Sequence, residues 1–312
     1  MSKKNRWTSD NIEDLTGRTA IVTGSNSGIG FEEARALALK GAAVILAVRD
    51  VDRGEQAAQR IRDEHPAASV EVLPLDLASL DSVRAFAETF KRKHAALHLL
   101  VNNAGVMMPP YGKTADGFEL QFGTNHLGHF ALTGLLLDRL LETEGSRVVN
   151  VSSQAHRQGR IDFEDLNWER KPYKKMRSYG QSKLANLLFT YELQRRLEAA
   201  GAKTIAVAAH PGWTATNLQQ HVGFFRSLNP LFAMKPWQGA LPTLYAATSE
   251  DVHGGEYYGP SGIYEMRGWP KRVKSVPASH DAADAARLWD VSEELSGVSY
   301  DRLYAAGSQP GE

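Results

Sequence analysis

The feature that most constrains this fold is a regular alternation of short apolar runs with longer stretches of helical period. The apolar runs are rich in β-branched residues, which is typical of buried strands. Strands are predicted over Thr19–Thr23, Val44–Val48, Val70–Leu73, Leu97–Val101, Arg147–Val151, Thr204–Ala208 and Glu256–Tyr258. Continuous apolar strands that are separated by helices belong to a parallel sheet covered on both faces.

Helices are predicted between these strands. They cover residues 28–40, 52–64, 79–93 and a long region around 116–141, and a late helix opens at Tyr179–Lys183. Right-handed crossovers then give an α/β fold with a doubly wound parallel sheet of the Rossmann type. Because no Pro/Ser-rich linker or internal repeat divides the chain, we expect a single domain. Its parts are a polar N-terminal tail (1–16), the domain itself (17–304) and a C-terminal tail (305–312).

Composition excludes several classes of function. Lys plus Arg and Asp plus Glu both number 36, so a formal charge of zero gives no reason to expect a nucleic acid partner. The absence of cysteine excludes disulfides, thiolate metal sites and a catalytic thiol. No apolar run has the length of a membrane span, and the basic start lacks the apolar stretch of a signal peptide. We therefore expect a cytoplasmic protein.

A glycine-rich turn joins the first predicted strand to the first predicted helix. Its sequence is Gly24-Ser-Asn-Ser-Gly28-Ile-Gly30. Glycines let the backbone turn tightly and approach a pyrophosphate, which rests on the positive N-terminus of the helix. The spacing differs from the G-x-G-x-x-G fingerprint, and such a turn also serves ordinary strand–helix connections. Its place in a βαβ unit favours a dinucleotide site.

Further motifs follow in a fixed order and carry a family resemblance. These are Thr23, Asp76-Leu77, Asn102-Asn103-Ala104-Gly105 and Tyr179-Gly-Gln-Ser-Lys183. Together they resemble the short-chain dehydrogenase/reductase family, over the chain from about Gly17 to Gly262. Other phrases resemble its retinol-dehydrogenase-like branch, namely Asn125-His-Leu-Gly-His-Phe130, Val151-Ser-Ser-Gln-Ala-His156, Ser182-Lys-Leu-Ala-Asn186 and the stretch Ala286–Gly297.

The resemblance implies a set of dinucleotide contacts along the chain. They are Gly24, Ser25, Ser27, Gly28, Ile29 and Gly30 in the turn, Asp76 and Leu77 at the adenine, Asn103, Ala104 and Gly105 beside the adenosine ribose, Tyr179 and Lys183 near the nicotinamide ribose, and Pro211, Thr214 and Thr216 at the carboxamide. Two of these residues have simpler alternatives. Asp76 could cap the helix that starts near Ser79, and Asn103 could brace adjacent strands.

The residues after the second strand bear on the choice of dinucleotide. An enzyme that uses NAD usually places an acidic residue about 18 positions after the third glycine. That position holds Val48, and Arg49 follows it. A guanidinium can bind a 2′-phosphate with two hydrogen bonds, so NADP(H) is favoured. Asp50 could turn back toward the ribose, which leaves NAD(H) open.

Tyr179 and Lys183 have the spacing that carbonyl chemistry needs. Hydride transfer to a carbonyl requires a proton donor at the oxygen, and the reverse reaction requires a base there. A free tyrosine has a pKa near 10, and a nearby ammonium lowers it. Residues four apart lie on one face of a helix, so we expect Lys183 to lower the pKa of Tyr179.

Ser153 and Asn125 complete the candidate catalytic set. Ser152 and Ser153 follow the fifth predicted strand, at the edge where doubly wound sheets bind ligands, and a hydroxyl there can stabilise a developing oxyanion. The resemblance assigns the catalytic role to Ser153 and makes Asn125 the fourth member. His126 and His129 lack a third ligand at useful spacing, so no metal is expected.

These observations predict an oxidoreductase that transfers a hydride between NADP(H) and an apolar carbonyl or alcohol, a small-molecule substrate, as a homo-oligomer. The alternative is a non-catalytic NADP-binding regulatory protein on the same fold, which would be expected to lose Tyr179, Lys183 or Ser153. Residues 212–236 are predicted to form a mobile substrate segment. It carries Trp213, Phe224, Phe225, Leu228, Leu231 and Phe232. These side chains either make the pocket apolar or pack the segment down.

Overall fold

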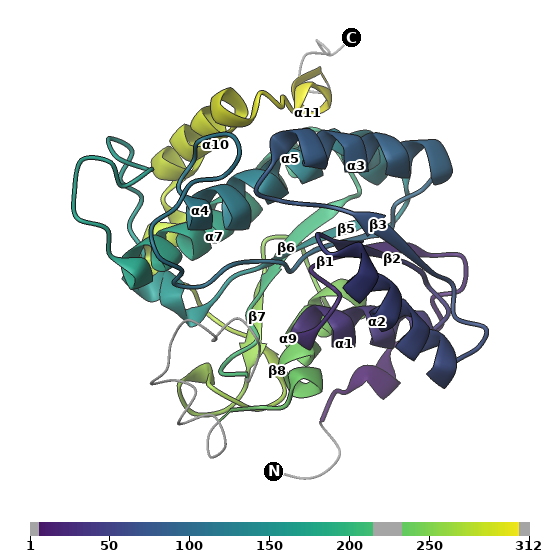
Figure 1. Ribbon diagram of the computed structural model, residues 1–312. Coiled ribbons are helices and arrows are strands. Elements are labelled where there is room, and N and C mark those ends of the chain that lie inside the picture. The colour runs from purple at the N-terminus through teal and green to yellow at the C-terminus, as the bar shows by residue number, and fades with distance from the viewer. Residues whose placement is uncertain (1–5, 215–232, 306–312) are drawn as a thin grey trace.

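The computed structural model describes residues 6–214 and 233–305 (Figure 1). These residues form an eight-stranded sheet in the order β3-β2-β1-β4-β5-β6-β7-β8. The strands are β1 Thr19–Thr23, β2 Ala43–Val48, β3 Val70–Pro74, β4 Leu99–Asn102, β5 Arg147–Val151, β6 Ile205–Ala209, β7 Tyr257–Pro260 and β8 Pro270–Arg272. All neighbouring pairs are parallel except β7 and β8. The predicted doubly wound α/β sheet is confirmed.

Helices cover both faces of the sheet (Figure 1). On one face lie α1 Gly28–Leu39, α2 Val51–Glu64 and α9 Pro236–Thr248, and on the other lie α3 Leu80–Lys93, α5 Gly128–Leu135, α7 Lys175–Ala199 and α10 Ala282–Ser296. Alternate strand residues point to opposite faces. Val22 therefore belongs to the same buried cluster as Leu37 of α1, whereas Ile21 belongs to the buried cluster of Phe130 of α5. This two-sided burial explains why the strands are apolar without interruption.

The reversal of strand order at β1 determines where a ligand can bind. Strand β1 pairs with β2 on one side and with β4 on the other, so the connections leave its two sides in opposite directions. In doubly wound sheets, ligands bind at this switch point, outside the carboxyl ends of the strands. The turn after β1 and the loops after β4, β5 and β6 all open at that edge.

The prediction of one long helix around residues 116–141 is wrong. The structure has α4 Leu120–Phe122, a π-helical turn at Gly123–Leu127, α5, and α6 Leu137–Glu142. The Glu119 carboxylate accepts hydrogen bonds from the backbone of Gln121 and Phe122, which starts the helix at residue 120 rather than 116. The hydrophobic period continues through the π turn, so it could not reveal this irregularity. Single π turns often mark functional sites.

Two further segments differ from simple expectation. The antiparallel strand β8 was not predicted, because its sequence, Pro-Lys-Arg, carries no apolar signal. Part of the polar N-terminal tail packs on the domain: Ile12 is buried, and the Trp7 ring lies 5.2 Å from that of Tyr245. The chain ends in the described region with α11 Asp301–Ala305. No helix of residues 6–214 and 233–305 is long and apolar enough to cross a membrane.

A carboxyl group lies buried between α1 and α9. Glu33 has no exposed surface, and burial raises its pKa from 4.5 to about 8, against a weaker opposing effect of the Thr243 hydroxyl. The folded chain therefore keeps Glu33 protonated at pH values where the unfolded chain ionises it. Its contribution to stability is full below pH 4.5 and is lost as the pH rises to about 8.

We expect Glu33→Gln to gain stability relative to the wild type as the pH rises. A neutral amide removes the linkage, so the difference in unfolding free energy should grow by up to about 1.4 kcal/mol per pH unit and level off above the folded pKa. Urea unfolding across this pH range measures the difference. Glu164→Gln, at an exposed side chain, is the matched control. Parallel stability curves for the wild type and Glu33→Gln would contradict the assignment.

Candidate active site

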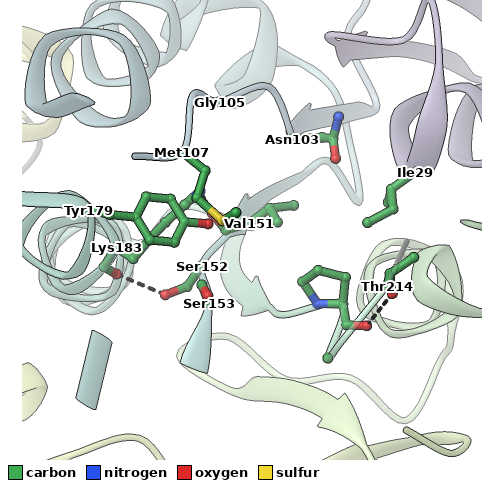
Figure 2. Close-up of a pocket in the computed structure, with 12 residues that line it drawn as sticks. Ile29, Asn103, Gly105, Met107, Val151, Ser152, Ser153, Tyr179, Lys183 and Thr214 are labelled. Atoms are coloured by element: carbon green, nitrogen blue, oxygen red, sulfur yellow. Dashed lines mark hydrogen bonds between the residues drawn. The ribbon is translucent and has the colours of Figure 1, made fainter. Parts of the chain in front are cut away.

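A cavity opens at the carboxyl edge of the sheet, where the predicted motifs meet (Figure 2). Its walls come from the turn after β1, the loops after β4, β5 and β6, and helix α7. The lining residues are Ile29, Asn103, Gly105, Met107, Val151, Ser152, Ser153, Tyr179, Lys183, Pro211, Gly212 and Thr214. Candidate residues that are far apart in the sequence therefore surround one space.

Tyr179, Lys183 and Ser153 lie together in this cavity. Helix α7 begins at Lys175, so Tyr179 is in its second turn and Lys183 is one turn further. Both side chains are buried, and the Lys183 ammonium is 5.8 Å from the centre of the Tyr179 ring. The Ser153 and Tyr179 side chains line the same cavity, close enough for the Ser153 hydroxyl to influence the pKa of Tyr179. A proton donor and a second hydroxyl thus converge where a substrate oxygen can bind.

The electrostatics of this pair differ from expectation. Burial raises the pKa of Tyr179 to about 12, and the Ser153 hydroxyl opposes this shift only partly. Burial also lowers the pKa of Lys183 to about 8, and its ammonium donates to the Val151 carbonyl at 2.9 Å. Burial, and not the predicted lowering by Lys183, therefore sets the direction of the Tyr179 pKa in this structure. At neutral pH Tyr179 is a neutral phenol, the form that can give up a proton.

Asn125 stands behind the cavity wall in the π-helical turn. Its amide oxygen accepts from the Val106 backbone at 2.7 Å, and its amide nitrogen donates to the Val106 carbonyl and to the Ser182 hydroxyl, both at 3.0 Å. A Cβ placed on Gly105 would lie 3.0 Å from the Asn125 oxygen and 3.6 Å from the Lys183 ammonium. Asn125 therefore fixes the loop after β4 close to Lys183.

The turn after β1 has the geometry of a phosphate site. Gly24 and Gly28 have left-handed φ angles of 68° and 62°. A Cβ on Gly30 would lie 2.4 Å from the Asn103 amide, so glycine is required there. The Ser25 hydroxyl closes the turn onto the Val22 carbonyl at 2.8 Å. These features allow close approach of a ligand to the backbone.

The N-terminus of α1 suits an anion. Within this helix the Ser27 side chain makes no capping hydrogen bond, and the first turn contains no acidic residue. Unsatisfied backbone N–H groups and the positive end of the helix dipole attract phosphate. The residues present therefore fit the pyrophosphate of a dinucleotide, and Ile29 of the same turn lines the cavity.

Asn103 and Asp76 can be compared with their simpler alternatives. The Asn103 amide donates to the Thr23 carbonyl at 2.8 Å, so it does brace β1 against β4, and it also lines the cavity. The Asp76 carboxylate accepts from the Ala78 backbone, whereas Ser79 caps α3. Asp76 is therefore not the helix cap. Leu77 is buried beside it, and Ala104 lies against Gly24.

Arg49 and Asp50, the two residues that follow β2, differ in their surroundings. Asp50 caps α2, because its carboxylate accepts from the Arg53 backbone at 3.0 Å. Arg49 is exposed at the end of the strand. The cap engages Asp50 in the helix, which weakens the alternative in which it turns toward a ribose.

The loop after β6 brings Pro211 and Thr214 to the cavity. The Thr214 hydroxyl donates to the Pro211 carbonyl at 2.9 Å, and the Met234 backbone donates to the Trp213 carbonyl, also at 2.9 Å. The described ends of the predicted substrate segment are thus paired. Its interior, with Thr216, Phe224, Phe225, Leu228, Leu231 and Phe232, lies outside the described residues.

Met107 is a lining residue that the sequence interpretation missed. It lines the same cavity as Tyr179 (Figure 2). Its position two residues after the Asn-Ala-Gly motif was the available signal. The paired histidines are part of the packing: His126 is hydrogen-bonded to Ser292, and His129 lies between the Asn125 carbonyl and the Thr23 hydroxyl. Among the described residues, no three His, Asp or Glu side chains form a metal-binding group.

Comparisons with known proteins agree with this geometry. The profile of the family described as short chain dehydrogenase matches residues 18–224. Retinol dehydrogenase 11 of Homo sapiens is 46% identical over 292 residues, which cover 92% of this chain and 88% of that protein.

Solved structures also match the fold. A crystal structure of a protein from Mycobacterium paratuberculosis is 46% identical, with a TM-score of 0.81, and the match covers 95% of this chain and 99% of that one. A short chain dehydrogenase from Shigella flexneri, complexed with NADP, is 25% identical, with a TM-score of 0.65 over 78% and 98% of the two chains. The chain therefore belongs to the short-chain dehydrogenase/reductase family, in its retinol-dehydrogenase-like branch, and is an NAD(P)-dependent oxidoreductase that acts on CH–OH groups.

Proposed function

We propose that this enzyme interconverts an apolar carbonyl compound and its alcohol, with NADP(H) as the preferred dinucleotide. The observation that carries the proposal is that Tyr179, Ser153 and Lys183 line one cavity, with Tyr179 one helical turn from Lys183. A non-catalytic binding protein has no need to keep these three groups together. The predicted homo-oligomeric state and cytoplasmic location stay predictions.

Tyr179 acts as the general acid in carbonyl reduction. When bound, the dinucleotide supplies or accepts the hydride. Tyr179, neutral because its pKa is about 12, gives its proton to the substrate oxygen. Ser153 donates a hydrogen bond to the same oxygen as negative charge develops there.

Lys183 and Asn125 support the proton transfer. The phenolate that remains after the transfer is stabilised by the Lys183 ammonium, whose pKa of about 8 also makes its proton available. Lys183 would also hold the nicotinamide ribose. Asn125 holds the Gly105–Val106 backbone beside Lys183, so the ammonium keeps its place.

The preference for NADP(H) rests on Arg49. Its guanidinium can bind a 2′-phosphate, and Asp50 is engaged as the cap of α2. The Shigella flexneri relative, which was solved with NADP, gives separate support. The turn Gly24–Gly30 would hold the pyrophosphate, Asp76 to Leu77 and Asn103 to Gly105 would hold the adenosine end, and Pro211, Thr214 and Thr216 would hold the carboxamide.

An apolar substrate fits the side chains around the reacting groups. Ile29, Met107, Val151 and Pro211 give the cavity apolar walls. Relatives such as retinol dehydrogenase 11 and retinol dehydrogenase 13 are named for retinol, a large apolar alcohol. We therefore assign the substrate to the medium or large apolar aldehydes, ketones and alcohols.

Tyr179→Phe should remove turnover and leave dinucleotide binding nearly intact, because only the proton-transfer hydroxyl is lost. General acid–base assistance is typically worth about 10²–10⁴-fold, so kcat should fall by at least about a hundredfold. Reduced-dinucleotide absorbance measures turnover, and fluorescence titration measures binding. Tyr264→Phe, at an exposed tyrosine, is the control. A Tyr179→Phe enzyme with roughly a third of wild-type activity would rule out this mechanism.

Arg49→Ala should weaken the use of NADPH far more than that of NADH. Charge-assisted hydrogen bonds contribute about 1.5–3 kcal/mol, so the ratio of the two kcat/KM values should shift by roughly tenfold to a hundredfold. Steady-state kinetics with both dinucleotides measures the ratio. Arg287→Ala, at an exposed arginine of α10, should leave it unchanged. An equal loss with both dinucleotides would show that Arg49 does not discriminate between them.

Catalytic efficiency should rise with the alkyl chain length of the substrate until the pocket is full. Each apolar Å² that the pocket covers contributes about 25 cal/mol. Aldehydes of about two to about ten carbons, compared with hydrophilic carbonyls of similar size, give the measurement. Efficiency that is flat in chain length, or highest for the hydrophilic compounds, would exclude the apolar substrate class. Failure of the whole panel would favour a non-catalytic role.

A further inference from the structure

Four polar side chains that the proposed chemistry does not use form a network beside the cavity. We call it the His210–Glu265 network; its members are Gln154, Arg157, His210 and Glu265. Gln154 directly follows Ser153, and His210 directly precedes Pro211. Glu265 lies in the turn of residues 261–269, between β7 and β8. The network therefore joins both cavity loops to a third segment.

The hydrogen bonds of His210 fix its protonation. Its ring is fully buried, which lowers its pKa and keeps it neutral at neutral pH. The Gly212 backbone N–H donates to Nδ1 at 3.2 Å, so the single proton of the ring is on Nε2. That nitrogen donates to the Glu265 carboxylate at 3.1 Å, and its 3.4 Å approach to the Gln154 amide is then only a packing contact.

The Glu265 carboxylate accepts hydrogen bonds from residues of two different loops. The oxygen that accepts from His210 also accepts from the Gln154 amide at 2.5 Å. Arg157 donates to the Gln154 oxygen at 2.6 Å, and its guanidinium lies 3.6 Å from the second oxygen of Glu265. These donors keep the pKa of Glu265 below its usual value. Glu265 is thus an ionised acceptor that holds Gln154 and His210 together.

The backbone of the turn of residues 261–269 packs against the loop after β6. Tyr264 and Glu265 have left-handed φ angles of 52° and 56°, an uncommon conformation for residues other than glycine. The Trp213 backbone donates to the Met266 carbonyl at 2.7 Å. A Cβ on Gly212 would lie 2.6 Å from that carbonyl oxygen. The turn therefore touches the Gly212–Trp213 backbone directly.

We propose that Glu265 and His210 are positioning residues for hydride transfer, which hold the Pro211–Thr214 segment at a fixed distance from Ser153. The inference rests on the proposed function, in which that segment holds the nicotinamide end and Ser153 holds the substrate oxygen. The network sets how the two reacting partners face each other. None of its four members is among the residues that line the cavity.

Loss of the network should therefore lower kcat more than dinucleotide affinity. Misplacement of a reacting group by about 1 Å can cost about a hundredfold in rate. Most of the proposed dinucleotide contacts, from Gly24–Gly30 and the adenosine side, lie on β1 to β4 and do not involve this network. Glu265→Gln keeps an oxygen for both donors, whereas Glu265→Ala removes the acceptor.

The experiment compares the full-length wild type with Glu265→Ala, Glu265→Gln and the surface control Glu164→Gln. Turnover of an apolar aldehyde gives kcat, NADPH fluorescence titration without substrate gives Kd, and thermal unfolding gives Tm. We expect Glu265→Ala to lose at least about tenfold in kcat with less than about a threefold change in Kd. Glu265→Gln should recover most of the kcat. Gln154→Ala should also lower kcat with little change in Kd, but by a smaller factor than Glu265→Ala.

A merely structural role gives a different result. In that case Glu265→Ala would lower Tm and the number of binding sites, with kcat per NADPH-binding site within about twofold of the wild type, and the proposal would be wrong. A Glu265→Gln enzyme as impaired as Glu265→Ala would also overturn it. Should Glu265→Ala fail to fold, the Gln154→Ala and Glu265→Gln results decide. A wild type that binds NADPH but reduces no carbonyl would instead refute the proposed function, and this inference with it.

Discussion

The junction of β1 with β4 at Thr23 is the constraint on which the rest of the site depends. The Thr23 hydroxyl accepts the backbone N–H groups of Asn103 and Ala104 at 3.0 and 2.9 Å, just where the order of the sheet reverses. The same hydroxyl lies 3.0 Å from His129, whose other nitrogen reaches the Asn125 carbonyl. One buried side chain thus joins the glycine-rich turn, the loop after β4 and the π-helical turn.

Burial then sets the chemistry of the groups that face the cavity. The same removal from water acts in opposite directions on an acid and a base, because it disfavours whichever form is charged. It keeps Tyr179 as a phenol and makes Lys183 a weaker base, which prepares the pair to deliver a proton. Helix α7 supplies both groups from a single buried face, and the Ser152 hydroxyl ties β5 to that face through the Lys183 carbonyl.

Much of this arrangement could be predicted from the sequence, because its signals are local. Alternation located seven of the strands, and the family motifs named most of the residues that line the cavity, with Met107 among the exceptions. Features that depend on contacts between distant residues could not be predicted from the sequence. The π turn keeps the hydrophobic period, β8 is a short polar edge strand, and the net pKa of Tyr179 depends on how deeply the whole fold buries it. The contact between Glu265 and His210 joins residues 55 apart, and no motif marks it.

The central claim is that Tyr179 and Ser153 together hold the oxygen that gains or loses the proton. A crystal structure of the enzyme with NADP⁺ and an apolar alcohol tests this directly. The account predicts the alcohol oxygen within hydrogen-bond distance, about 2.6–3.2 Å, of both hydroxyls. An oxygen bound by other groups, with both hydroxyls beyond hydrogen-bond distance, would contradict it.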